Sequence, residues 1–112
     1  TYPLAIPDND SGGVSADLVV SESWWPTSIA ELQVGVRITH TWRGDLTVSV
    51  TSPTGTTAIL HDGTGGSADD LIDLYDLDDF DGEDANGTWT LTVVDGGGGD
   101  TGDIVEWFVL AQ

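Results

Sequence analysis

The chain has 112 residues, a length that predicts one domain with a single modest core. Its 20 acidic residues far outnumber the two basic ones, and the formal net charge of −18 argues against nucleic acid and anionic membranes as partners, because both are bound through Lys and Arg. Cysteine is absent, which excludes disulfides and thiolate-bound metals, and a hydrophobic content of 38% with five Trp distinguishes the chain from a disordered acidic tail.

Strand-like stretches dominate the chain. The clearest is 29–39, where Leu32, Val34, Val36 and Ile38 alternate with polar residues or glycine, the period-two pattern of a half-buried strand. By alternation and β-branched content we predict strands at 16–21, 29–39, 46–52, 56–60, 89–94 and 104–110. Gly- and Asp-rich turns separate these segments, so the pattern predicts an all-β single domain over 1–112, a jelly-roll β-sandwich.

The segments between these strands carry turn signals. Residues 53–55 (PTG) predict a tight hairpin turn, 10–13 a turn, and the run 95–99 (DGGGG) a flexible hairpin tip. The segment 68–77 has Leu71, Leu74 and Tyr75 at helical spacing, but it is short and rich in Asp. We therefore expect an irregular loop there, with at most one helical turn.

The strongest chemical feature is a run of nine carboxylates within residues 69–84. Calcium takes six to eight oxygen ligands, and flexible acidic loops supply them. The candidate ligands are Asp69, Asp70, Asp73, Asp76, Asp78, Asp81 and Glu83, with Asp79 and Asp84 completing the run. The spacing is not that of an EF-hand, and a solvated acidic face or a surface adapted to high salt explains the same composition.

Two weaker calcium candidates lie elsewhere in the chain. Asp8 and Asn9 near the amino end predict a second site, and Asp95, Asp100 and Asp103 around the glycine-rich run predict a third.

Arg43-Gly44-Asp45 is a tripeptide that some integrin ligands carry, but its position favours a structural role. Asp45 directly precedes a predicted strand, and Arg43 is one of two cations in a strongly acidic chain. We expect Arg43 to pair with a carboxylate and to anchor the fold through its planar guanidinium, with Asp45 as a structural residue at the strand start.

The five tryptophans divide into two groups. Trp42, Trp89 and Trp107 are predicted core residues because they lie in or beside strands. Trp24 and Trp25 precede Pro26 in a predicted loop, where an exposed indole can contact a protein partner or stack on a sugar ring. The alternative is that one of this pair closes the end of the sandwich.

No catalytic motif is evident in the sequence. The two histidines, His40 and His61, lie in no zinc motif, and no nucleophile elbow is present. With 20 acidic residues, the sequence does not single out any two carboxylates as the catalytic pair of a glycosidase. We expect His40 to lie at a strand end and to pack or form hydrogen bonds there.

Several motifs in one order resemble a known family. They lie at 6–9 (IPDN), 12–15 (GGVS), 38–46 (ITHTWRGDL), 51–56 (TSPTGT), 80–83 (FDGE), 85–91 (ANGTWTL), 99–102 (GDTG) and Trp107. Together they resemble the P-domain of kexin-like subtilases, the proprotein convertase P-domain. The resemblance implies a jelly-roll sandwich without catalytic residues that follows a protease catalytic domain, and Thr41-Trp42 with the acidic loops resembles bacterial versions.

The resemblance implies a function as well. We expect a noncatalytic accessory domain of a secreted bacterial serine protease or metalloprotease, monomeric and extracellular. It would stabilise or position the catalytic domain of the same parent chain, aid contact with protein substrate, and bind calcium. The alternatives are a carbohydrate-binding or lectin-like module and a cell-surface spacer or adhesion domain.

Overall fold

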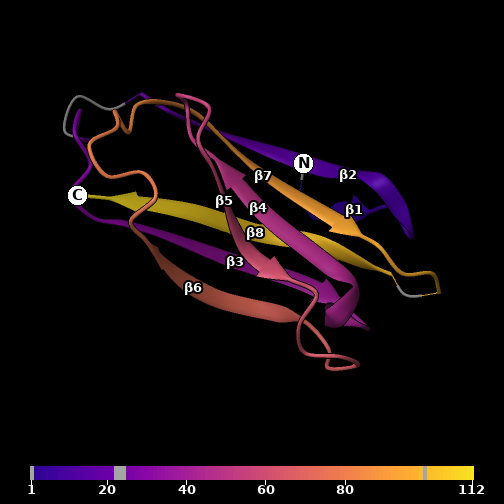
Figure 1. Ribbon diagram of the computed structural model, residues 1–112. Coiled ribbons are helices and arrows are strands. Elements are labelled where there is room, and N and C mark those ends of the chain that lie inside the picture. The colour runs from indigo at the N-terminus through magenta and orange to yellow at the C-terminus, as the bar shows by residue number, and fades with distance from the viewer. Residues whose placement is uncertain (1, 22–24, 100) are drawn as a thin grey trace.

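The computed structural model describes residues 2–21, 25–99 and 101–112, which form eight β-strands and one short 3-10 turn (Figure 1). The strands are β1 (Leu4–Ile6), β2 (Asp10–Val20), β3 (Leu32–His40), β4 (Leu46–Thr51), β5 (Thr57–Asp62), β6 (Leu71–Leu77), β7 (Gly87–Asp95) and β8 (Gly102–Ala111). The turn, η1, spans Arg43–Asp45. The described residues contain no helix that is long and apolar enough to cross a membrane.

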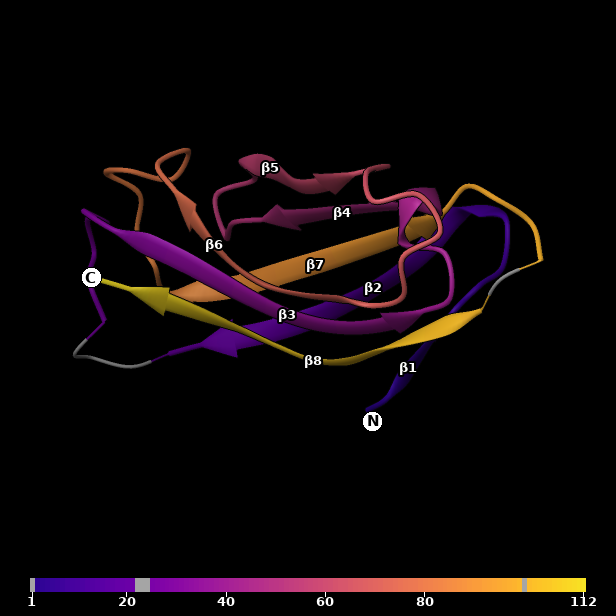
Figure 2. The same cartoon turned by 90° about the horizontal axis from the view of Figure 1, so that it is seen from below.

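The strands form two four-stranded antiparallel sheets packed face to face (Figure 2). Sheet A has the order β1-β8-β3-β6 and sheet B the order β2-β7-β4-β5. Only β4 and β5 follow each other within one sheet, and every other connection crosses between the sheets. This strand order is that of a double-sheet jelly roll, which confirms the predicted fold class.

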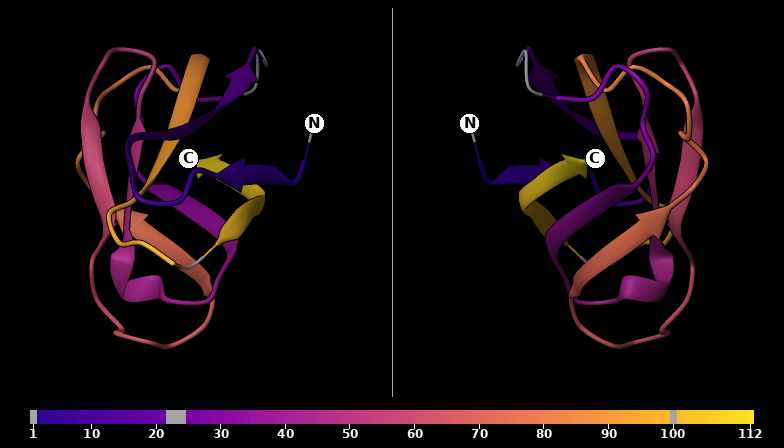
Figure 3. Two further views of the ribbon diagram at one scale, coloured as in Figure 1. Left: turned by 90° about the vertical axis from the view of Figure 1, so that its right-hand side faces the viewer. Right: turned by 90° about the vertical axis from the view of Figure 1, so that its left-hand side faces the viewer.

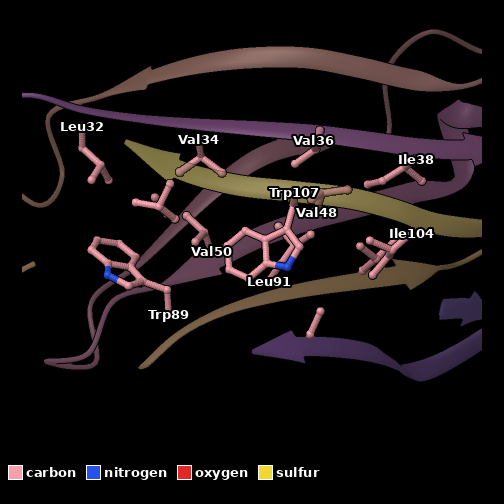
Figure 4. Close-up of a cluster of buried hydrophobic side chains, with 14 of the residues drawn as sticks. Leu32, Val34, Val36, Ile38, Val48, Val50, Trp89, Leu91, Ile104 and Trp107 are labelled. Carbon is pink, nitrogen blue, oxygen red and sulfur yellow. The ribbon is translucent and has the colours of Figure 1, made fainter. Parts of the chain in front are cut away.

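The core fills the space between the sheets. Side chains from β3 and β8 point toward those from β4 and β7, as Figure 4 shows. A bulge in the β3–β8 pairing, where Arg37 faces Glu106 but Ile38 faces Ile104, lets both Ile104 and Trp107 point inward although they are three residues apart.

Two of the three tryptophans predicted in the core are there. Trp89 is fully buried, donates its indole N–H to the Ala85 carbonyl at 2.9 Å, and meets the Phe80 ring edge-on with centroids 5.2 Å apart. Trp107 is also buried. The prediction for Trp42 is wrong, since its side chain is 43% exposed. It lies in the connection between β3 and η1, outside the alternation that directs strand residues inward.

The structure corrects three local predictions. The segment expected to be an irregular loop contains β6, because pairing with β3 provides the hydrogen-bond partners that local propensity did not indicate. Residues 10–13, expected as a turn, begin β2 through a bulge. The run 95–99 is no hairpin tip: it joins β7 in sheet B to β8 in sheet A (Figure 3). The short strand β1 was not predicted.

Candidate interaction surface

The acidic segment 69–84 does not fold into one cage of carboxylates. Its centre is β6, where successive side chains alternate between faces, so Asp73 shares the side of Leu71 while Asp76 lies on the outer side. The flanking loops hold Asp69, Asp70, Asp78, Asp79, Asp81, Glu83 and Asp84. Over the part of the chain that the structure describes, no three acidic or histidine side chains converge as metal ligands would.

Several of the proposed ligands accept hydrogen bonds within the fold, among them Asp70, Asp73, Asp76 and Glu83. Asp70 Oδ1 accepts from the His40 backbone N–H at 3.0 Å, and the Asp70 N–H donates to the His40 carbonyl at 2.8 Å. Glu83 accepts from the Ser52 hydroxyl at 2.7 Å and from the Thr54 hydroxyl. Burial acts to raise the pKa of Glu83, but the hydrogen bonds from Thr54, Ser52 and Thr56 outweigh it and leave that pKa lowered.

The two weaker calcium candidates are placed as follows. Asp8 Oδ2 accepts from the Gly99 N–H at 3.2 Å, so the β1–β2 and β7–β8 connections lie side by side. Asp95 is fully buried, whereas Asp103 lies in β8 opposite Thr39. Asp100 lies outside the described residues.

The buried pair of His40 and Asp95 joins the two sheets. Nε2 of His40, at the end of β3, lies 3.0 Å from Asp95 Oδ2, at the end of β7, and both side chains are fully buried. Nδ1 accepts from the Trp42 N–H at 3.1 Å, so the ring proton resides on Nε2 and is donated to Asp95. Asp95 Oδ1 accepts from the Gly97 N–H at 3.0 Å. With every polar atom engaged and no exposure, this pair has no access to a substrate.

Arg43 and Asp45 form the turn η1, and Asp45 directly precedes β4 as predicted. The turn is held by backbone hydrogen bonds from Arg43 to Ala68 and from Gly44 to Gly66, and the Arg43 carbonyl accepts from His61 Nε2 at 2.9 Å. Among the described residues no carboxylate lies within ion-pair distance of Arg43, and its buried Nε has no hydrogen-bond acceptor. The expected ion-paired anchor is therefore not found in the described part of the chain.

Of the two adjacent tryptophans, Trp24 lies outside the described residues. Trp25 is half-buried and packs against the edge of the core, in keeping with a tryptophan that closes the end of the sandwich. It also lines a shallow groove of about 650 Å³ with Val19, Val20 and Asn86.

The outer face of sheet A carries large apolar side chains. Ile72 and Leu74 of β6 are 67% and 50% exposed, and Phe108 and Leu110 of β8 are 45% and 50% exposed. The register places Leu74 and Phe108 on either side of Gly35 in β3, and Ile72 in the row of Arg37 and Glu106. We call Ile72, Leu74, Phe108 and Leu110 the apolar patch.

Gly35 shapes the centre of this patch. A Cβ at this position would lie 2.2 Å from Phe108 Cε1, so the phenylalanine ring lies directly over the glycine backbone. An open groove of about 430 Å³ runs here between Phe108 and the β6 side chains, and Arg37 and Glu106 border it. Arg37 Nη1 and Glu106 Oε1 are 3.8 Å apart, and both side chains are largely exposed.

One end of the patch adjoins carboxylates. A second groove, of about 640 Å³, includes Leu110 and four acidic residues from three parts of the chain: Glu31, Asp76, Asp78 and Asp81. We call these four residues the acidic rim. Asp76 accepts from Gln33 Nε2 at 2.7 Å. Asp76, Asp78 and Asp81 of the rim belong to the acidic run 69–84, so the fold places part of that run beside an apolar surface.

Two features of the sequence indicate this surface. The strand 104–110 is apolar on almost every residue, the pattern of a strand covered on both faces. Within 71–77, Ile72 and Leu74 alternate with Asp73, a strand period that the helical spacing of Leu71, Leu74 and Tyr75 concealed.

The chain is similar in sequence to known proteins whose chains are several times longer. The chain is 39% identical over 107 residues to leupeptin-inactivating enzyme 1 of Streptomyces exfoliatus, matching 96% of this chain and 24% of that protein. It is 39% identical over 108 residues to a transglutaminase-activating metalloprotease of Streptomyces mobaraensis, matching 96% of this chain and 14% of the relative. A calcium-dependent protease of Trichormus variabilis is 37% identical over 108 residues, matching 88% of this chain and 16% of the relative. This chain thus spans a quarter or less of these relatives.

The fold has a counterpart among solved structures. The serine protease of Aeromonas sobria contains a region that superposes with a TM-score of 0.79 at 22% identity, covering 99% of this chain and 25% of that one. At this identity the likeness establishes the fold alone. The family profile of the proprotein convertase P-domain matches residues 29–110, well over half of the chain. The chain therefore belongs to the proprotein convertase P-domain family.

Proposed function

We propose that this chain is a noncatalytic accessory domain of a larger, exported protease, in which it stabilises or positions the catalytic domain and aids contact with protein substrate. The observation that carries the proposal is family membership combined with length: the chain matches 14% to 24% of relatives that include a named metalloprotease and a named calcium-dependent protease. The parent enzyme is a serine protease or a metalloprotease.

The internal chemistry of the domain supports this role. The histidine-carboxylate pair that could serve acid-base catalysis, His40 and Asp95, is sealed inside the sandwich. Glu83 accepts hydrogen bonds from the β4–β5 turn, and Asp70 accepts one from the end of β3. These polar groups connect elements of the fold, as expected for a domain whose task is mechanical support.

The test is deletion of residues 1–112 from the full parent protease. We expect less active enzyme to accumulate and faster loss of activity on warming, while kcat/KM of the enzyme that does fold stays the same on a short peptide. Peptidase or glycosidase activity in the 112-residue chain alone, or a deletion that leaves yield and thermal inactivation unchanged, would contradict the proposal.

Calcium binding is the finer part of the proposal. It is supported by the net charge of −18 and by the calcium dependence that the name of one relative states. Because the described carboxylates of 69–84 do not converge, a calcium ion bound there would combine one or two carboxylates with backbone carbonyls and water.

Thermal unfolding separates calcium binding from charge screening. At equal ionic strength, we expect calcium to raise Tm above the value in magnesium or sodium chloride, and a chelator to reverse the rise. Equal shifts with all three salts would assign the effect to screening of the acidic surface and would remove calcium from the proposal.

A further inference from the structure

The apolar patch lies on a face that the fold itself leaves uncovered. Sheet A packs against sheet B through its inner face, so Ile72, Leu74, Phe108 and Leu110 project away from the core. Four large apolar side chains, each at least 45% exposed and grouped on two strands that flank β3, form one contiguous surface. Grouped exposed apolar residues rimmed by polar ones are typical of protein-protein contact sites.

The surface is also shaped for contact. Gly35 lets the Phe108 ring lie over the backbone of β3, which opens the groove of about 430 Å³ toward Ile72 and Leu74. A partner side chain entering this groove would meet apolar walls on both sides. Arg37 and Glu106 already face each other at its border, and therefore contribute little net charge there.

The charge around the patch defines the chemistry of the partner. The acidic rim adjoins Leu110 with four carboxylates, and the chain as a whole carries a net charge of −18. Approach of another acidic surface is opposed at this end, whereas Lys or Arg is attracted. A second copy of this chain is therefore a poor occupant, because two bodies of the same large negative charge repel.

We propose that the apolar patch docks onto the catalytic domain of the same parent chain, on a surface with an apolar centre and a basic margin that faces the acidic rim. This inference rests on the proposed accessory function and specifies the surface through which it acts. Relatives have several times the length of this chain, so a covalently joined partner is available at high effective concentration. Because the two domains are joined covalently, a weaker contact is enough to hold them together than between separate chains.

The first test maps the surface in the intact parent protease by carbene footprinting. We expect Ile72, Leu74, Phe108 and Leu110 to be labelled several-fold less than Val19 and Ile59, which are 70% and 61% exposed on sheet B. Equal labelling of the two groups in the intact protease, or protection of Val19 and Ile59 alone, would overturn the inference.

The second test uses a matched pair of variants in the parent protease. Ile72→Asp and Ile59→Asp introduce the same charge at similarly exposed positions, one in the patch and one on sheet B. We expect Ile72→Asp to shorten the half-life of activity on warming about tenfold, the ratio for loss of one good interface contact, and Ile59→Asp to change it less than about twofold. Amide exchange in β3 checks that both variants keep the fold.

The outcomes distinguish this inference from the proposed function. If deleting residues 1–112 shortens the half-life but Ile72→Asp behaves like Ile59→Asp, the accessory function stands and the docking face is wrong. If deletion has no effect, the accessory function itself fails, and the docking inference fails with it.

A third test addresses the acidic rim. Asp78→Asn and Asp81→Asn together should weaken the salt dependence of the parent's thermal inactivation and shorten its half-life about two- to fivefold at low salt. Asp62→Asn, an exposed carboxylate at the end of β5, is the matched control and should leave both unchanged. A rim variant indistinguishable from Asp62→Asn would exclude the basic margin.

Discussion

The two outer faces of this sandwich are built by the same strand geometry but differ in chemistry. The outer face of sheet B presents hydroxyl side chains that pair across strands: Ser15 with Thr92 at 3.2 Å, and Thr51 with Thr57 at 2.9 Å. Thr90 adds a hydrogen bond to Asp17 at 2.9 Å. The outer face of sheet A presents the apolar patch and the acidic rim instead.

The difference shows which outer face is suited to contact with water. Threonine suits a strand because of its branched Cβ, and its hydroxyl can be satisfied by a cross-strand neighbour or by water. Ile72, Leu74, Phe108 and Leu110 satisfy the same strand preference but leave apolar area in water, at a cost of about 25 cal/mol per Å². Sheet B also exposes Val19 and Ile59, but they lie on its opposite edge strands, β2 and β5, whereas sheet A groups four such side chains and gains stability from a cover.

The largest expected effect concerns the joint that holds the two sheets together. Asp95→Ala leaves the buried His40 Nε2–H without its acceptor and frees the Gly97 N–H, so we expect a loss of about 3–5 kcal/mol in the free energy of unfolding by urea. A loss below about 1 kcal/mol would mean that the sheets are held by apolar packing alone. Asp62→Ala, at the exposed end of β5, serves as the control.

A smaller effect is expected at Glu83, which links the 78–86 loop to the β4–β5 turn of sheet B. Its pKa is lowered in the folded state, so its stabilising contribution is complete above the ordinary pKa of 4.5 and is lost as the pH falls through the lower folded value. Glu83→Gln should therefore reduce Tm at pH 7, and the difference from the wild type should shrink as the pH falls below 4.5.

Measurement of Tm against pH for both proteins isolates this residue from the general titration of the acidic surface. A difference between wild type and Glu83→Gln that is the same at pH 7 and at pH 3 would contradict the role of the charged carboxylate.

The hydroxyl face allows a more subtle test of its cross-strand pairs. Replacing Thr51 and Thr57 together by Val keeps the branched shape and removes the 2.9 Å hydrogen bond, so we expect a change of about 0.2–1 kcal/mol by urea unfolding. The double variant also makes sheet B more like sheet A. If it acquired a tendency to associate that the wild type lacks, apolar character alone would be enough to create a contact face.

The smallest effect is expected for the stability of the isolated chain. In the 112-residue chain alone, Ile72→Asp and Ile59→Asp should each change stability by no more than about 0.5 kcal/mol, since both side chains are largely exposed. The two faces would then be equivalent in isolation and differ only in the parent protease. A large destabilisation by Ile72→Asp in the isolated chain would assign the patch to the fold rather than to docking.

Much of the architecture was predictable because the alternation of apolar residues indicates which side of a strand is buried. Leu32 to Ile38 in β3 and the matching residues of β4, β7 and β8 therefore identified the core and the all-β class. The absence of cysteine excluded disulfides as a source of stability. The charge of −18 argued against nucleic acid and anionic membranes as partners. Ordered motifs from 6–9 to Trp107 were sufficient to indicate the P-domain family.

Tertiary structure alone decided how distant segments meet. Strand β6 forms because β3 supplies partners for its backbone, an interaction that local sequence does not encode. The same pairing distributes the carboxylates of 69–84 over two faces and brings Leu74 across Gly35 from Phe108, a residue far along the chain. Likewise, His40 contacts Asp95 only because β3 and β7 both terminate at the same end of the sandwich. Contacts between sheets depend on strand order and not on nearness along the chain.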